Sequence, residues 1–249
     1  MTDYNTTFEK LGAVQKGHFI LTSGNHSDTY VQCARILENP EVTAQICQEL
    51  IKPWNDRGIN IVVGPALGGI ILSYELARAL SRMNSGWQGK GIDLRHNAKA
   101  MYLERVEGKL ALRRGFMVPA GSKVIVAEDV ITTGGSVKEV IDVLEQQGAP
   151  MLTSGAPRIP AGHRGAKVLG IISLVDRRPA EPQPRRSGIN SVPPAPTNVG
   201  DYFGEKGNQI FGIQYNSIIQ VNPPIYQPND CPLCKQGIPT EKPGSRGLK

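Results

Sequence analysis

The chain has 249 residues, a formal net charge of +6 and a pI near 9.2, and 39% of its residues are hydrophobic. This length suits one domain with additions, and 28 glycines with 19 prolines indicate many loops. It contains no run of about 18 apolar residues, which excludes a membrane-spanning helix. The polar N-terminus lacks the apolar core of a secretory signal. Four cysteines do not make a disulfide framework in a chain this long, so we expect a cytoplasmic protein.

The positive charge is spread along the chain. Lys and Arg occur singly or in short pairs, and no basic stripe studded with aromatic residues is present. An excess of basic over acidic residues can favour binding of nucleic acid, anionic lipid or anionic small molecules. The scattered pattern favours phosphorylated small molecules and makes nucleic-acid binding the weaker interpretation.

The N-terminal region predicts a helix followed by a β-hairpin. Residues 5–15 are expected to be helical, and Gly17–Val31 contains an apolar strand, a Ser-Gly-Asn turn and a second strand at residues 29–31. His18 and His26 have no visible metal or triad partner in the sequence, so we interpret both as structural residues of the hairpin. Asn39-Pro40 then predicts the start of a helix, with Asn as the cap and Pro in its first position.

Two later stretches share one pattern, a buried strand that runs through a glycine-rich turn into a helix. The first is Ile61–Gly69, which precedes a helix at residues 70–80. The second runs from Lys123 to Ser136 and precedes an amphipathic helix for which Gly148 is the expected C-terminal cap. Small residues and free N–H groups at a helix start favour anion binding, so two phosphate-like sites are predicted.

The second stretch also carries two carboxylates, Glu128 and Asp129, just before its turn. Carboxylates beside a phosphate are unfavourable unless they bind another part of the ligand, such as ribose hydroxyls or a divalent cation. A ligand with a phosphate at one end and a sugar diol at the other satisfies the whole stretch. The plainer alternative is a buried strand and an ordinary helix with acidic loop residues.

The residues Val126–Ser136 resemble the phosphoribosyl-pyrophosphate motif of type I phosphoribosyltransferases. The hairpin at residues 17–31 narrows the resemblance to the orotate phosphoribosyltransferases, as does the Pro-Ala-Leu-Gly-Gly turn that ends at Gly69. Two departures from the family pattern are Thr22 and Gly68, where many or some members have Lys. The resemblance covers roughly four fifths of the chain.

Residues 104–116 resemble the flexible catalytic loop of that family. Arg105 and Lys109 match its loop positions, and mobile cations at a pyrophosphate leaving group would offset the charge that develops there. Read without the resemblance, the segment is a charged, solvated hairpin. Arg177, at the end of a predicted strand over residues 168–177, matches the family arginine that reads the orotate carboxylate, for which a planar guanidinium is well suited.

The remaining segments are less regular. Residues 84–99 and 179–207 are expected to be surface insertions, residues 100–103 a short strand, and residues 209–213 and 217–221 further strands. The tail, residues 226–249, contains Cys231-Pro-Leu-Cys234. This motif could be half of a zinc site or a redox pair, and we favour a simple structural turn because no second ligand pair is evident.

The resemblance implies a single α/β domain of the type I phosphoribosyltransferase fold over residues 1–249, with a central parallel sheet and an N-terminal hood over residues 1–35. It implies transfer of phosphoribosyl from phosphoribosyl pyrophosphate to orotate, a Mg²⁺ cofactor bound mainly through the substrate, and a homodimer whose loop 104–114 reaches the neighbouring site. Catalytic roles fall on Asp129, Lys109 and Arg105, and the orotate contacts on Thr132, Arg177, Tyr30 and Val31. The implied contacts to phosphoribosyl pyrophosphate are Gly68, Arg105, Lys109, Glu128, Asp129, Val130, Ile131, Thr132, Thr133, Gly134, Gly135 and Ser136. Two alternatives stay open: an enzyme that uses another base, and a non-catalytic sensor of phosphoribosyl pyrophosphate.

Overall fold

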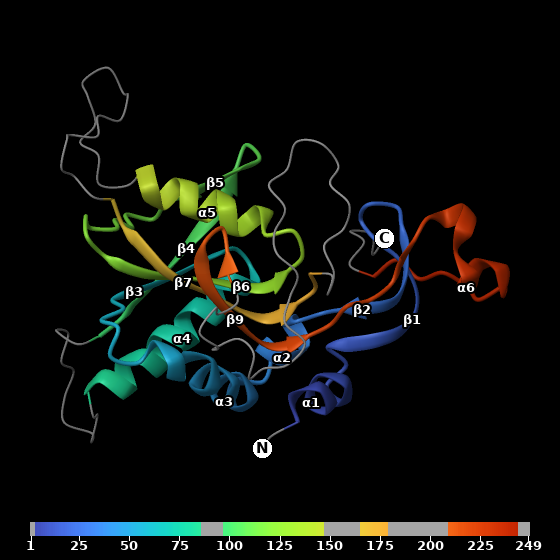
Figure 1. Cartoon of the computed structure of the whole chain (residues 1–249), viewed down its shortest axis with the longest axis horizontal. Coiled ribbons are helices and arrows are strands. Elements are labelled where there is room, and N and C mark those ends of the chain that lie inside the picture. Colours follow the sequence, from blue (N-terminus) through green and yellow to red (C-terminus); the bar gives the residue numbers. More distant parts are fainter. Residues whose placement is uncertain (1–2, 86–96, 147–164, 179–208, 244–249) are drawn as a thin grey trace.

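The computed structural model describes residues 3–85, 97–146, 165–178 and 209–243. In the described part, a large central sheet with helices on both faces is joined to a smaller sheet on one side (Figure 1). None of the helices in this part has the length and apolar composition needed to cross a membrane.

The central sheet has seven strands in the order β5-β4-β3-β6-β7-β9-β8. The five middle strands are parallel, and β5 and β8 add antiparallel edges, which confirms the predicted parallel core. The strands are β3 Ile61–Pro65, β4 Lys99–Val106, β5 Lys109–Leu112, β6 Lys123–Ile131, β7 Lys167–Asp176, β8 Gln209–Ile210 and β9 Ile213–Gln220.

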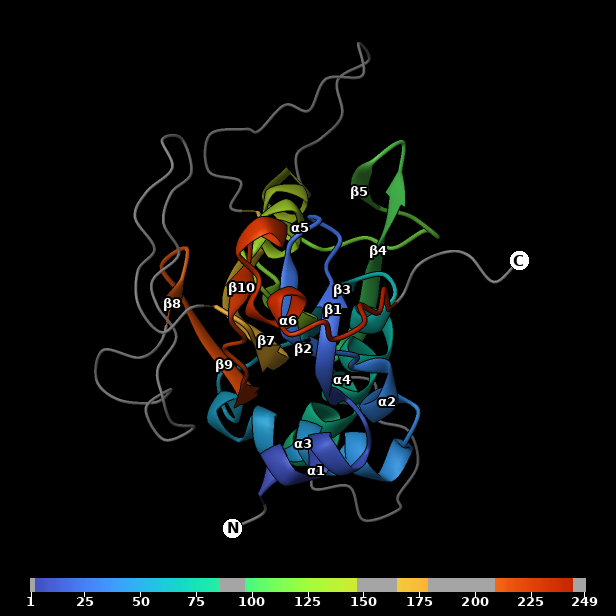
Figure 2. The same ribbon diagram turned by 90° about the vertical axis from the view of Figure 1, so that its right-hand side faces the viewer.

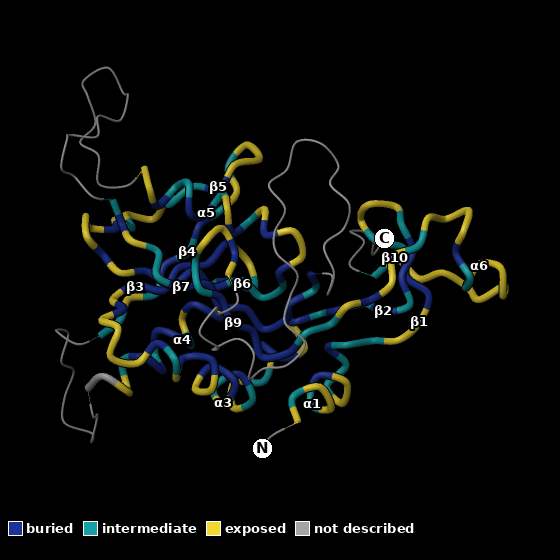
Figure 3. Tube along the Cα trace, in the orientation of Figure 1, coloured by how far each residue is buried: buried dark blue, intermediate teal, exposed yellow. Residues whose placement is uncertain are grey.

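Helices cover both faces of this sheet. Figure 1 shows α3 and α4 on one face and α5 on the other, and the alternating side chains of the buried strands fill one core on each face. Figure 3 shows the middle strands buried along most of their length. The helices are α1 Tyr4–Lys10, α2 Ala34–Leu37, α3 Pro40–Ile51, α4 Gly68–Ser85, α5 Gly135–Gln146 and α6 Pro232–Lys235, with 3₁₀ turns η1 Lys52–Trp54 and η3 Pro228–Asp230.

One close approach explains a glycine in the middle of β7. A Cβ at Gly170 would lie 2.1 Å from the ring of Trp54, which is fully buried. The Trp54 Nε1–H donates to Asn216 Oδ1 at 2.9 Å. The bulky indole therefore fixes the position of η1 against β7 and β9, and only a glycine at position 170 leaves room for the indole ring.

The smaller sheet contains the predicted hairpin. Strands β1 (Val14–Ile20) and β2 (His26–Val31) are antiparallel, and the short strand β10 (Ile225–Tyr226) from the tail pairs with β2. Figure 2 views this sheet with the tail in front. We call the β1–β2 hairpin the hood.

Several predicted boundaries are wrong for local reasons. The first helix ends at Lys10 rather than residue 15, because Gly12 takes φ +70° and strand β1 begins at Val14. The second hood strand starts at His26 rather than residue 29. The predicted strands at 209–213 and 217–221 are instead β8 and a longer β9, joined by a turn at Phe211 and Gly212 with positive φ.

The insertions are only partly described. Residues 84–85 end α4 and Lys99 begins β4, so the predicted 84–99 segment is shorter at both ends. Residues 179–207, the predicted cap Gly148 and residues 86–96 lie outside the described residues.

Candidate active site

The predicted site residues meet at the edge of the central sheet that faces the hood. Parallel strands β3, β6 and β7 end there, and helices α4 and α5 begin there. Ligands bind beyond the carboxyl ends of strands in parallel α/β sheets. This edge is therefore where the chemistry of the chain is expected.

A pocket of about 250 Å³ lies between the end of β6 and the start of α5. It is polar because backbone N–H groups and hydroxyls surround it, and Gly134 takes φ +78°, a conformation that favours glycine. The residues that line it are Glu128, Val130, Ile131, Thr132, Thr133, Gly134, Gly135, Ser136, Val137 and Glu139. Seven of the residues predicted to bind the phosphate end of the ligand, Val130 to Ser136, thus form one wall, as anion binding at a helix N-terminus requires.

The carboxylate of Glu128 is held in an unusual state. Its Oε2 atom is buried and has no hydrogen-bond partner in the described part of the chain. Burial raises the pKa of Glu128 to about 8, and the neighbouring Asp129 carboxylate adds to the effect. A buried acceptor without a partner is costly, so this oxygen is available to a ligand that brings hydroxyl donors.

This state predicts a pH-dependent stability cost. Between pH 4.5 and about 8 the folded protein retains a proton that the unfolded chain has released, so the free energy of unfolding falls as the pH rises through this window. We expect Glu128→Gln to raise the free energy of unfolding at pH 8 by roughly 2 kcal/mol, with little change at pH 4.5. Urea unfolding without ligand or Mg²⁺ measures this, with Glu145→Gln on the exposed part of α5 as control. Equal pH slopes for Glu128→Gln and the parent protein would contradict the assignment.

Asp129 packs directly against the β3–α4 turn. A Cβ at Gly68 would lie 2.3 Å from Asp129 Oδ2 and 2.5 Å from Asp129 Cγ. A Cβ at Gly64 would likewise lie 2.6 Å from the carbonyl oxygen of Ala127. The β3–α4 turn is therefore in contact with the end of β6, and a lysine at position 68 would displace Asp129. This explains in steric terms why Gly68 departs from the lysine found in some family members.

Gly68→Ala is accordingly expected to lower kcat/KM at least about tenfold, because the added methyl group moves the Asp129 carboxylate from its position. Steady-state kinetics with both substrates measures the loss. Tyr74→Ala, on the exposed face of the same helix, should keep parent activity. A fully active Gly68→Ala protein would show that the position of Asp129 is unimportant.

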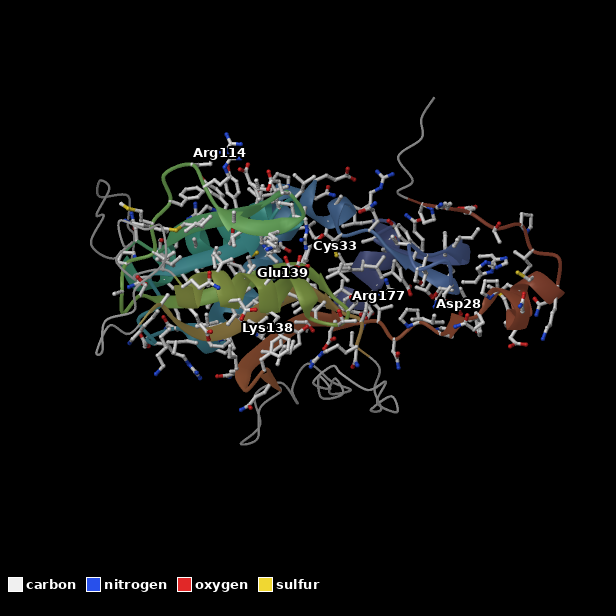
Figure 4. All side chains as sticks on the ribbon, turned by 90° about the horizontal axis from the view of Figure 1, so that it is seen from above. Asp28, Cys33, Arg114, Lys138, Glu139 and Arg177 are labelled. Atoms are coloured by element: carbon white, nitrogen blue, oxygen red, sulfur yellow. The ribbon has the colours of Figure 1, made fainter. Side chains whose placement is uncertain are left out.

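Arg177 follows β7 and lies at the junction with the hood, close to Cys33 (Figure 4). Its Nε is buried without a hydrogen-bond partner in the described structure, while its backbone N–H donates to Ile131 O at 2.7 Å. Burial lowers the pKa of the Arg177 guanidinium, and Tyr30 and Cys33 oppose this shift. A half-buried cation with an unused donor is suited to a planar carboxylate ligand.

The hood supplies the other predicted residues near Arg177. Tyr30 is half-buried and its ring lies 5.7 Å from that of Phe19, whereas Val31 is buried at the end of β2. The structure thus brings Tyr30 near Arg177, although the two residues are distant in sequence. It also contributes Cys33, which was not predicted: its Sγ lies 3.5 Å from the carbonyl oxygen of Asp129, and burial raises the pKa of its thiol well above the usual value.

The segment predicted as a flexible loop is a β-hairpin made of β4 and β5. Arg105 reaches across to Glu139 of α5, with N–O distances of 3.0 and 3.1 Å, and so lies beside the pocket. Lys109 is exposed at the start of β5, and Arg114 pairs with Glu104 at 2.8 Å. The predicted strand at residues 100–103 is part of β4 and extends to Val106, and the segment has the hairpin form that its sequence suggests when read without the resemblance.

Comparisons with known proteins agree with this geometry. The profile of the phosphoribosyl transferase domain family matches residues 33–156. The chain is 42% identical over 241 residues to the orotate phosphoribosyltransferase of Thermotoga maritima, with 97% of each chain covered. It is 37% identical over 241 residues to that of Desulforamulus reducens, covering 97% of this chain and 95% of the relative.

Two solved structures share the fold. Orotate phosphoribosyltransferase from Aeropyrum pernix superposes with a TM-score of 0.51 at 21% identity, covering 88% of this chain and 94% of that one. Adenine phosphoribosyltransferase from Rhodothermus marinus superposes with a TM-score of 0.50 at 17% identity, covering 87% and 99%. The type I phosphoribosyltransferase fold predicted for residues 1–249 therefore agrees with these neighbours.

Proposed function

Because this chain belongs to the orotate phosphoribosyltransferase family, we propose that it transfers phosphoribosyl from phosphoribosyl pyrophosphate to orotate. The products are orotidine 5′-phosphate and pyrophosphate, a step of pyrimidine biosynthesis. The observation that carries the proposal within the structure is a single sheet edge with a polar pocket at a helix N-terminus, a pair of acidic side chains and a half-buried guanidinium with an unused, buried Nε donor.

The phosphoribosyl end of the donor fits the β6–α5 region. In this proposal, residues 132–136 hold the 5′-phosphate through backbone N–H groups and hydroxyls. Glu128 and Asp129 accept hydrogen bonds from the ribose hydroxyls, which supplies the partner that Glu128 Oε2 lacks. The β3–α4 turn at Gly68 lies against Asp129 and faces the pyrophosphate.

Orotate is placed between the hood and the end of β7. Arg177 binds its carboxylate, Tyr30 and Val31 cover the ring, and Thr132 approaches from the phosphate loop. The support for this placement is the proximity of Tyr30 to Arg177 and the burial of the Arg177 side chain.

In this proposed reaction the protein acts mainly by stabilising the charges that develop as bonds break. Breaking the bond to pyrophosphate leaves positive charge on the ribose ring, which the Asp129 carboxylate would stabilise. Glu128, whose pKa is raised to about 8, would add negative charge only when it is ionised. Negative charge develops on the leaving pyrophosphate, where Arg105 and Lys109 of the β4–β5 hairpin would offset it. No covalent nucleophile is required.

A magnesium ion is part of the proposal. Carboxylate oxygens are ligands that Mg²⁺ prefers. The buried, unpartnered oxygen of Glu128 is compatible with a hydrated Mg²⁺ ion held largely by the substrate. When bound, Mg²⁺ would neutralise charge on the pyrophosphate. Turnover that is unaffected by removal of Mg²⁺ would contradict this role.

The enzyme is also proposed to be a cytoplasmic homodimer in which the 104–114 hairpin reaches the partner's site. In the single chain, Arg105 already lies beside Glu139 at the pocket rim, so its reach toward a second pocket depends on a rearrangement of this ion pair. Sedimentation equilibrium at assay concentration tests the dimer, and a mass of one chain would contradict it.

The function itself is tested by assaying pyrophosphate release with orotate and, separately, with adenine and other bases. We expect turnover only with orotate. Turnover only with a purine would support the alternative of a purine phosphoribosyltransferase. Binding of phosphoribosyl pyrophosphate without turnover, together with salt-sensitive nucleic-acid binding, would instead support a sensor.

A further inference from the structure

His18 and His26, for which the sequence shows no partner, lie beside Cys231 and Cys234 of the tail. The ligand-type atoms of these four residues lie within 4.8 Å of one another. They include two of the four histidines and two of the four cysteines of the chain. We call these four residues the hood–tail cluster.

The distances in the cluster suit a single tetrahedral ion. His18 Nε2 lies 2.9 Å from His26 Nδ1 and 3.4 Å from Cys231 Sγ. Cys234 Sγ lies 3.3 Å from His26 Nδ1 and 3.7 Å from His18 Nε2. With Zn–S bonds of about 2.3 Å and Zn–N bonds of about 2.0–2.1 Å, tetrahedral geometry separates two nitrogens by about 3.4 Å, and a nitrogen from a sulfur by about 3.6 Å.

The surroundings hold the donors in the orientation that a metal needs. His18 Nδ1 lies 2.8 Å from the carbonyl oxygen of Ile238, so it carries the proton and leaves Nε2 as the unprotonated ligand atom. His18, His26 and Cys231 are buried, and only Cys234 is exposed. A buried group of two imidazoles and two thiols with an outer-shell carbonyl is the donor set of a structural zinc site.

We propose that this cluster binds one Zn²⁺ ion, which fastens the C-terminal tail to the hood. Binding would release the two thiol protons of Cys231 and Cys234 to solvent, giving a Cys₂His₂ site with no open position for substrate. Helix α6, which carries Cys234, lies beyond the hood and away from the central sheet and its candidate active site (Figure 1). The proposal therefore stands independently of the proposed function.

The tail already pairs with both outer edges of the hood, and the ion would add a third attachment between these two pairings. Strand β10 pairs with β2 through Tyr226 and His26, and Glu241 pairs with β1, where its N–H donates to His18 O at 2.7 Å and its carbonyl oxygen accepts from Ile20 N–H at 2.8 Å. The segment between them carries both cysteines. A zinc ion at its centre would hold the hood in the position that puts Tyr30 near Arg177.

Metal analysis of the full-length protein, purified under reducing conditions without added chelator, tests the site. We expect about one zinc per chain. The Cys231→Ser/Cys234→Ser double variant should lose it, while Cys47→Ala, in the core of α3 and outside the cluster, should retain it. Cobalt replacement should give the thiolate-to-metal charge-transfer band of a tetrahedral sulfur-ligated ion.

A second pair of variants distinguishes the loss of a metal ligand from misfolding of the protein. His26→Ala should lose zinc, and His26→Cys should regain it, because a third thiolate can replace the imidazole. Amide hydrogen exchange should rise in residues 14–31 on chelation and stay unchanged in β6, which lies in the central sheet. A metal-free protein, iron in place of zinc, or a Cys231–Cys234 disulfide in the protein purified under reducing conditions would each overturn the proposal.

Discussion

Asp129→Asn is expected to lower kcat/KM by about 10²- to 10³-fold, the range seen when one electrostatic contact to a charged transition state is removed. The Asp129 Oδ1 atom accepts a hydrogen bond from the Val130 N–H at 3.0 Å, and an asparagine oxygen can keep that bond. The local fold should therefore survive, and only the negative charge beneath the ribose would be lost. The loss should appear mainly in kcat, because the charge matters most as the ribose becomes cationic.

The matched control is Asp142→Asn. Asp142 lies on the solvent side of α5, where it pairs with Lys138, so this variant removes the same charge without touching the pocket. Steady-state kinetics with both substrates compares the two variants, and urea unfolding checks that their free energies of unfolding are equal. Parent-like kinetics for Asp129→Asn would remove Asp129 from the mechanism.

Arg177→Lys is expected to raise KM for orotate by about 100-fold, because a lysine keeps the charge but loses the forked donor pair, which is worth about 3 kcal/mol to a carboxylate. The KM for phosphoribosyl pyrophosphate should change little, since Arg177 lies at the hood side of the edge and does not line the phosphate pocket. Initial rates at varied orotate concentration measure the effect.

Arg57→Lys provides the corresponding control. Arg57 lies over the Trp54 ring and donates to Gln214 Oε1 at 2.7 Å, near the opposite end of β9. The Arg57→Lys variant should leave the KM values for orotate and for phosphoribosyl pyrophosphate unchanged. An unchanged KM for orotate in Arg177→Lys would mean that another group reads the orotate carboxylate.

The sequence predicted the central features of the site because their signals are local. Buried β-branched runs followed by glycine-rich turns marked the ends of β3 and β6, and the acidic pair stood in the same stretch as the phosphate loop. The structure added the steric reason for Gly68, which depends on the contact of the β3–α4 turn with the end of β6, a segment distant in sequence. Such a contact leaves no trace in the pattern of either segment.

The hood–tail cluster was missed for a similar reason. His18 and Cys231 are separated by 213 positions, so neither shows a ligand spacing in its own neighbourhood. The cysteine pair was visible, but its second ligand pair depended on β10 and Glu241 pairing with opposite edges of the hood. Arg105 shows a smaller difference: the predicted strand at residues 100–103 runs on to Val106, so Arg105 lies within β4 and not beyond it.

The pairing of Glu241 with β1 also bears on how the protein is made. The hood strands leave the ribosome long before their partners at residues 225–226 and 241. Domains fold from the N-terminus as they emerge, but this hood must wait with open outer edges until residue 241 has been made. Loss of residue 241 would thus leave the outer edge of β1 without its partner.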